Sequence, residues 1–99
     1  ISYDDIFSYQ LARFGKPIDI LLLFSVSGSS KNILKCAKEA KKKKIKIISF
    51  TGFNGGKIKN LVSLPIIVPS NSIPRIQESH RLILHIICDL VERYFINEK

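Results

Sequence analysis

The chain has 99 residues, 45% of them hydrophobic, which suits one modest core and a single domain or domain fragment over residues 1–99. Sixteen Lys and Arg against eight Asp and Glu give a formal net charge of +8, so the surface should attract anions. The longest apolar run, about seven residues, is too short to span a membrane, and no signal segment opens the chain. From the short apolar runs and the missing signal segment we expect a cytoplasmic protein. Because the chain contains no Met, we expect it to be a piece of a longer protein.

The first half of the chain predicts a helix, a strand and a second helix. Apolar residues recur near helical spacing over residues 3–14, and Gly15 to Pro17 end that pattern. Residues 18–24 are apolar apart from Asp19, as in a strand covered on both faces. After a cluster of serines, apolar residues from Ile33 to Ala40 alternate with lysines at helical spacing, which predicts an amphipathic helix.

The second half predicts two further strands and a long final helix. Residues 45–50 are β-branched and read as a strand bounded by Thr51 and Gly52, and residues 64–68 read as another. A turn at 54–56 and a short helix at 57–61 lie between them, and Ser70 or Ser72 is positioned to cap the final helix. The order predicts an α/β fold, a parallel sheet flanked by helices in a flavodoxin-like three-layer sandwich, here truncated. At least one edge of so small a sheet needs cover.

The cysteines and the lysine run carry no predicted chemistry. Cys36 and Cys88 lie in predicted helices without CxxC spacing, so we expect both to be small buried side chains in a reducing compartment. The run from Lys41 to Lys44 closes a helix, where cations interact favourably with exposed carbonyl groups. Since no aromatic residues interleave with these lysines, we do not expect nucleic-acid binding.

Residues 25–30 contain four serines and one glycine between a predicted strand and a predicted helix. Ligands bind at the carboxyl ends of parallel strands, where the next helix offers free N–H groups and the positive end of its dipole. Gly28 permits a close turn, and the hydroxyl groups can donate to phosphate oxygens. Two interpretations remain open: a phosphate site, or a turn in which Ser29 or Ser30 caps the helix. Nucleotide hydrolysis is unsupported, because no lysine occupies the Walker A position.

Three motifs follow one another in this chain. They are S-x-S-G-x-S at 25–30, T-G-x-x-G-G-K at 51–57 and R-I-Q-E-x-H at 75–80. In this order and spacing they resemble the sugar isomerase (SIS) domain, and specifically the phosphoheptose isomerase family. The resemblance extends over nearly the whole chain and corresponds to the C-terminal half of that family's subunit.

This resemblance implies an enzyme that converts sedoheptulose 7-phosphate to D-glycero-D-manno-heptose 7-phosphate through an enediol, in bacterial lipopolysaccharide precursor synthesis. It also implies a homotetramer with active sites at subunit interfaces. Ser25, Ser27 and Ser30 match phosphate-binding positions of the family. Val26 stands where the family usually has Thr, so one hydroxyl contact is lost.

On the final helix, the resemblance implies substrate binding by Gln77 and acid/base catalysis by His85. The glutamate that partners this histidine in the family lies outside the present chain. Many members bind zinc through a His and that Glu together with the positions of Gln77 and His85. Only two of four ligands are therefore present, so we expect this chain alone to hold zinc weakly and to be inactive.

Helical geometry alone gives a blander interpretation of the final helix. At ~100° per residue, one narrow polar stripe contains Glu78, Arg81, His85, Asp89 and Glu92. That pattern by itself predicts a solvated His85, whereas His80 is expected to pack. The wide apolar arc on the other side is more than one thin sheet face needs, which suggests contact with another subunit.

Two non-enzymatic alternatives share the fold. In a replication-initiator-associating protein, a tetramer that binds the bacterial initiator, Arg typically replaces the loop's second key serine and Asn replaces the helix histidine. Ser27 and His85 follow the isomerase pattern instead. A phosphosugar-sensing transcription regulator would need a fused DNA-binding domain, which these residues do not contain.

Overall fold

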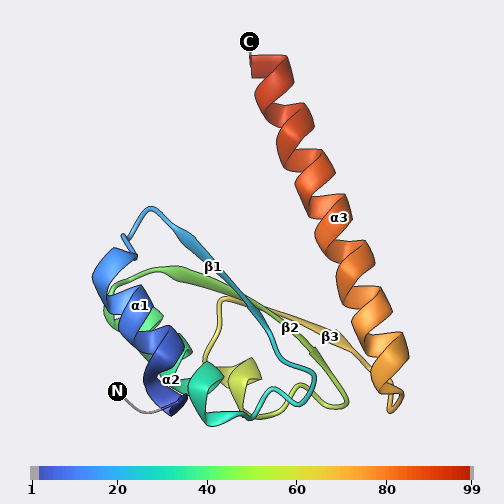
Figure 1. Ribbon diagram of the computed structural model, residues 1–99. Helices are drawn as coiled ribbons and strands as arrows, with labels where there is room; N and C mark the ends of the chain where they lie inside the picture. Colours follow the sequence, from blue (N-terminus) through green and yellow to red (C-terminus); the bar gives the residue numbers. More distant parts are fainter. Residues whose placement is uncertain (1–2, 99) are drawn as a thin grey trace.

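The computed structural model describes residues 3–98 and consists of a parallel sheet with helices on both faces (Figure 1). The elements in chain order are a 3-10 turn (Tyr3–Asp5), α1 (Ile6–Phe14), β1 (Ile20–Phe24), α2 (Lys31–Lys42), β2 (Lys46–Gly52), the 3-10 helix η2 (Lys57–Asn60), β3 (Leu64–Val68) and α3 (Ile73–Glu98). The predicted α/β fold with a parallel sheet is confirmed.

β2 is the central strand of the sheet, with β1 and β3 parallel to it on either side. In register, Phe24 of β1 and Ile66 of β3 both align with Phe50. Parallel neighbours require a crossover between them, and α2 and η2 supply the two crossovers. All three strands therefore end at the same edge of the sheet.

Two strand boundaries differ from the sequence prediction. β1 begins at Ile20 because Lys16 and Asp19 close a turn: the Lys16 N–H donates to Asp19 Oδ2, and the Asp19 N–H donates to the Lys16 carbonyl. β2 extends through Thr51 and Gly52, which the sequence suggested as its boundary. Here ladder pairing with β3, down to Gly52 opposite Val68, outweighs the poor strand propensity of glycine.

The main core lies between the sheet and α2. The residues buried there are Leu23, Ile33, Cys36, Ala37, Ala40, Ile45, Ile47 and Ile58. α1 packs on α2 and is tied to it by the ion pair between Lys35 Nζ and Asp5 Oδ1, 2.8 Å long. Lys43 Nζ donates to the carbonyl groups of Leu11 and Ala12 at the end of α1. One cation of the lysine run thus caps a neighbouring helix.

The first turns of α3 cover the opposite face of the sheet. His80 is 6% exposed and makes edge-on contacts with the stacked rings of Phe24 and Phe50, whose centroids lie 4.4 Å apart. A Cβ at Gly52 would overlap the side chain of Ile76, so this glycine lets α3 approach the end of β2 closely. The prediction that His80 packs is confirmed.

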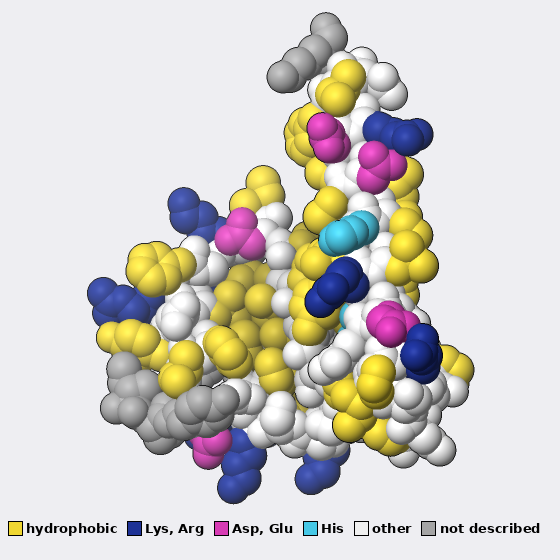
Figure 2. Space-filling model, turned by 45° about the vertical axis from the view of Figure 1, so that its right-hand side comes forward, with side chains coloured by type: hydrophobic (Ala, Val, Ile, Leu, Met, Phe, Trp, Pro, Cys, Tyr) yellow, Lys and Arg dark blue, Asp and Glu magenta, His cyan; other side chains and the backbone are white. Residues whose placement is uncertain are grey.

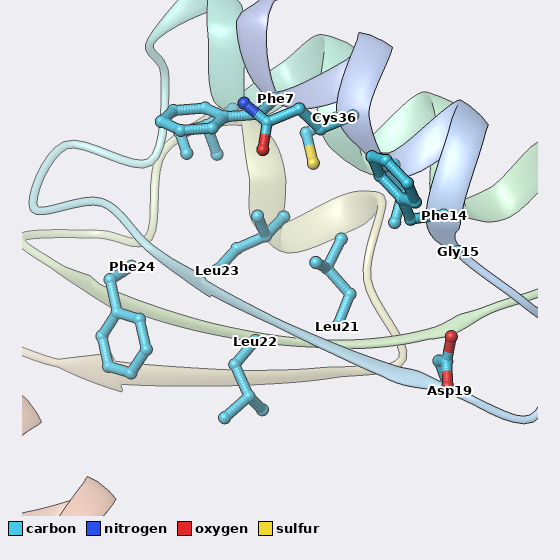
Figure 3. A pocket seen from close by; sticks show the side chains of 12 residues that line it. Phe7, Phe14, Gly15, Asp19, Leu21, Leu22, Leu23, Phe24 and Cys36 are labelled. Carbon is cyan, nitrogen blue, oxygen red and sulfur yellow. The ribbon is translucent and has the colours of Figure 1, made fainter.

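β1 forms an open edge beside an apolar groove of about 550 Å³ (Figure 3). Phe7, Phe14 and Cys36 line it from the helices, and Leu21 and Leu23 line it from the strand. Within residues 3–98 no strand pairs with the outer edge of β1. In β1 only Leu23 is buried, whereas Ile20 and Phe24 are exposed, so the prediction that this strand is covered on both faces is wrong for the described chain.

Most of α3 extends away from the sheet, so its later turns contact little else (Figure 1). Apolar side chains line this part of the helix (Figure 2), and the exposed ones are Leu82, Ile86, Leu90, Val91, Tyr94, Phe95 and Ile96. Cys88 is exposed in this segment, so the prediction that it is buried is wrong; the apolar arc of α3 simply has no partner here. No helix within residues 3–98 is both long and apolar enough to cross a bilayer.

The two cysteines should differ sharply in reactivity. Burial raises the pKa of the Cys36 thiol, with Glu39 adding to the effect, so at neutral pH this thiol is both shielded and protonated. In the 99-residue chain, iodoacetamide labelling followed by peptide mass spectrometry should modify Cys88 at least about ten times faster than Cys36, from the difference in thiolate access. Equal rates in the native protein would contradict this packing, and denaturant should equalise them.

Candidate functional site

The serine loop, defined as residues 25–30, continues directly from the end of β1. The Ser25 N–H donates to the Phe50 carbonyl, 3.0 Å away, and the Gly52 N–H donates to the Val26 carbonyl, 2.9 Å away. These bonds extend the β1–β2 ladder beyond the strand and hold the start of the loop. The loop thus lies at the carboxyl edge of the sheet, as predicted.

Three serine hydroxyls of the loop accept backbone hydrogen bonds. Ser25 Oγ accepts from the Gly28 N–H at 3.1 Å, and Ser27 Oγ accepts from the Ser29 N–H at 3.2 Å. Ser29 Oγ accepts from the Lys57 N–H at 3.2 Å. Each of these hydroxyl groups still has its own hydrogen to donate to a ligand.

Neither Ser29 nor Ser30 caps α2 through its side chain, which corrects the capping interpretation. Ser30 occupies the N-cap position, but its hydroxyl makes no capping bond, and Ser29 is engaged with Lys57. The N–H groups in the first turn of a helix lack partners within the helix. With the exposed hydroxyl of Ser30 beside them, they form an edge suited to an anion.

The serine loop interlocks with a glycine turn, defined as residues 52–56. Gly28 has φ +67°, and a Cβ there would overlap the carbonyl oxygen of Gly55. Gly56 has φ +62°, and a Cβ there would overlap the carbonyl oxygen of Ser27. The Ile58 N–H donates to the Gly28 carbonyl at 2.9 Å. The two loops therefore meet backbone to backbone, with no room for a side chain.

Sequence reasoning treated residues 54–56 as a turn and missed that they support the serine loop. Three glycines within five residues were the available signal, because glycine clusters often mark close backbone approach. Thr51 lies next to Gly28. Among the described residues, Thr51 Oγ1 and Ser49 Oγ are the two buried hydroxyl oxygens that have no hydrogen-bond partner.

A hollow of about 500 Å³ separates the start of the serine loop from α3. Ser25 and Val26 line one side, while Gln77, Arg81 and Leu84 line the other. His80 lies deeper in the wall, where its Nε2–H donates to the Thr51 carbonyl at 2.8 Å. We call this space the loop hollow. It brings the predicted residues Ser25 and Gln77 to one site.

A second hollow of about 450 Å³ continues along α3 and contains Gln77, Arg81 and His85. These three residues are spaced by four, so each lies about one turn above the previous one on the same face of the helix. We call this space the helix hollow. Gln77 and Arg81 line both hollows, so the hollow that contains Ser25 and the hollow that contains His85 share these two wall residues.

The structure places the predicted site residues unevenly. Ser25 lines the loop hollow, His85 lines the helix hollow, and Gln77 lines both. Ser27 and Ser30 are exposed on the serine loop and line neither hollow. His85 is exposed, as the helical stripe predicts. Arg81 is the residue that sequence reasoning left unassigned. Its signal was its position midway between Gln77 and His85 on one helix face.

The described residues offer only part of a zinc donor set. Within residues 3–98, no three His, Cys, Asp or Glu side chains gather closely enough to bind a metal. Gln77 and His85 provide one amide oxygen and one imidazole in the helix hollow, whereas a zinc site needs three or four protein ligands. The donor set in the described residues is therefore incomplete.

Comparison with known proteins fits this geometry. The model of the SIS domain family matches residues 1–52, which include β1, the serine loop and β2. The chain belongs to the SIS domain family. The match includes the serine loop and Gly52, whereas Gly55 and Gly56, which approach the serine loop, lie beyond it.

Similar proteins cover almost all of this chain. It is 45% identical over 96 residues to a phosphoheptose isomerase from Helicobacter pylori and 47% identical over 98 residues to one from Clostridium acetobutylicum. These alignments cover 97% and 99% of this chain but 50% of each relative. The chain thus spans about half the length of the curated relatives that it matches.

Two solved structures share the fold. A phosphoheptose isomerase from Francisella tularensis superposes with a TM-score of 0.89 at 39% identity, covering 92% of this chain and 49% of that one. One from Neisseria gonorrhoeae gives 0.87 at 35% identity, covering 90% and 51%. The sheet and helices of this SIS chain therefore correspond to about half of the chain in each of these two structures.

Replacing Gly28 with Ala should destabilise the SIS chain, because alanine at positive φ is strained and its Cβ would overlap Gly55. We expect Gly28→Ala to lower the free energy of unfolding by about 2 kcal/mol or more, measured by urea denaturation. Lys44→Gly is the matched control: Lys44 is exposed with φ +61°, so glycine should maintain or raise stability. A neutral Gly28→Ala would refute the interlock.

Proposed function

We propose that the complete protein carrying this SIS chain is a phosphoheptose isomerase, which converts sedoheptulose 7-phosphate to D-glycero-D-manno-heptose 7-phosphate. One observation carries the proposal: Gln77 and Arg81 line both hollows, so the serine loop and His85 flank the same two residues of α3. The names of the similar proteins support the same reaction. Their occurrence in bacteria fits the proposed role in lipopolysaccharide precursor synthesis.

The phosphate of the sugar is bound at the serine loop. Ser25, Ser27 and Ser30 donate from their hydroxyl groups, and the first-turn N–H groups of α2 add the positive end of the helix dipole. Two of these hydroxyls are already oriented, because Ser25 Oγ and Ser27 Oγ each accept a backbone N–H. A preorganised loop loses less conformational freedom when the phosphate binds.

The carbon end of the sugar extends along α3 toward His85. Gln77 binds substrate hydroxyl or carbonyl oxygens at the junction of the two hollows. His85 exchanges a proton with the sugar, while a second acid/base group outside this chain acts on the opposite side. One proton leaves C1 and one is added to C2, while a hydroxyl proton moves from O1 to O2, so the ketose becomes an aldose through the enediol without net oxidation.

Oligomer, metal and compartment are part of the same proposal. The exposed apolar side chains of α3 support a homotetramer in which subunits cover this helix. Zinc is proposed only for the complete protein, where Gln77 and His85 would supply two of its ligands and the metal would polarise the substrate oxygens. The proposed compartment is the cytoplasm. The binding-protein alternative is not favoured, because the relatives described above are isomerases by name.

His85 provides the direct test of catalysis. In the complete protein, His85→Gln should reduce kcat by about 100-fold or more, as expected when a general acid/base is lost. Its melting temperature should not change, because His85 is exposed. His80→Gln is the contrasting variant: it removes a buried hydrogen bond to Thr51 and should lower the melting temperature. Unchanged turnover in His85→Gln would exclude the catalytic role.

The serine loop provides an independent test of phosphate binding. Replacing Ser27 and Ser30 together with Ala should raise KM for sedoheptulose 7-phosphate by about 10-fold or more, since two hydrogen bonds to a charged group are lost. Ser8→Ala, on α1 and away from both hollows, is the control. If KM stays at the control value, the loop only shapes the turn.

A further inference from the structure

We infer that Arg81 is a substrate-binding residue, whose guanidinium binds the phosphate of the sugar across the loop hollow from Ser25. This inference rests on the proposed function, and it adds a contact from α3 to a phosphate site otherwise formed by the serine loop. The argument depends on the charge balance of α3, the lining of the hollow and the chemistry of the loop.

Arg81 differs from the other two arginines of α3 in its ion pairing. Arg75 pairs with Glu78 at 2.8 Å, and Arg93 pairs with Asp89 at 3.1 Å. Arg81 makes no ion pair with any residue between 3 and 98. Its exposed guanidinium is therefore not paired with a carboxylate and can bind an anionic ligand. The carboxylate of nearby Glu78 is paired with Arg75.

Arg81 lines the loop hollow on the side opposite the serine loop. The side chains that line the loop hollow are Phe24, Ser25, Val26, Gln77, His80, Arg81 and Leu84. Arg81 is the only Lys, Arg, Asp or Glu among them. The side chain of Val26, on the loop side, offers no hydrogen bond, so side-chain contacts for an anion in this hollow come from Ser25 and from α3.

The chemistry of the loop leaves a need for such a cation. The loop itself contains no Lys or Arg, and the lysines that flank it, Lys31 and Lys57, do not line the loop hollow. A guanidinium binds phosphate through two parallel N–H···O bonds, which neutral hydroxyls cannot match in strength. Arg81 also lines the helix hollow, which contains His85. A phosphate bound by Arg81 would therefore have a fixed position relative to His85.

The experiment compares Arg81→Gln, Arg81→Lys and Arg93→Gln in the complete polypeptide. Arg93→Gln is the matched control, because Arg93 lies on the same helix, is also exposed and lines neither hollow. Three quantities are measured: the Kd for inorganic phosphate by calorimetry, and KM and kcat for sedoheptulose 7-phosphate. Arg81 is exposed, so these variants should fold normally, which circular dichroism checks.

We expect Arg81→Gln to raise both the phosphate Kd and KM by about 10- to 100-fold, the usual range for a lost hydrogen bond to a charged group. kcat should fall much less, because a contact to the phosphate serves ground state and transition state alike. Arg81→Lys should recover part of the affinity, since lysine retains the charge but not the paired geometry.

Other outcomes separate this inference from the proposed function. Phosphate Kd and KM equal to those of Arg93→Gln would overturn the role of Arg81. A large fall in kcat at unchanged KM would also overturn it, since Arg81 would then act at the reacting carbons. If the unmodified protein shows no isomerisation but binds phosphate in an Arg81-dependent way, the proposed function fails and the anion contact stands. Absence of phosphate binding in every form would refute the contact.

Discussion

The close backbone contact between the serine loop and the glycine turn is the constraint on which the site depends. Gly28, Gly55 and Gly56 all have positive φ, and side chains at Gly28 or Gly56 would overlap carbonyl groups of the facing loop. Without this contact, the loop would lose the hydrogen bonds that Lys57 and Ile58 donate to it. The loop shape that presents serine hydroxyls and helix N–H groups to an anion therefore originates in a second segment, about 25 residues along the chain.

The end of β2 fixes the other half of the site. The Thr51 carbonyl accepts the hydrogen bond from buried His80, and Gly52 leaves space for Ile76, so the start of α3 is held against the sheet. From there the helix extends away from the sheet (Figure 1), and its polar stripe includes Arg81 and His85. One strand end thus positions both the serine loop and the helix that faces it.

Two apolar surfaces are left uncovered within the described residues: the groove beside β1 and the outer turns of α3. The chain spans about half the length of its relatives, and the candidate site it contains is correspondingly partial. It holds the serine loop and one acid/base candidate, His85, but no complete metal site among residues 3–98.

The sequence by itself determined the element order, the parallel α/β class and the position of the serine loop, because hydrophobic period and Gly or Pro boundaries are local properties. It also separated packed His80 from exposed His85 by helical rotation. Only the tertiary structure decided that β1 is open, that Cys88 is exposed and that Ser29 bonds to Lys57 instead of capping α2. The pattern of apolar residues shows which side chains avoid water. Their burial and their hydrogen-bond partners depend instead on which distant segment of the chain packs beside them.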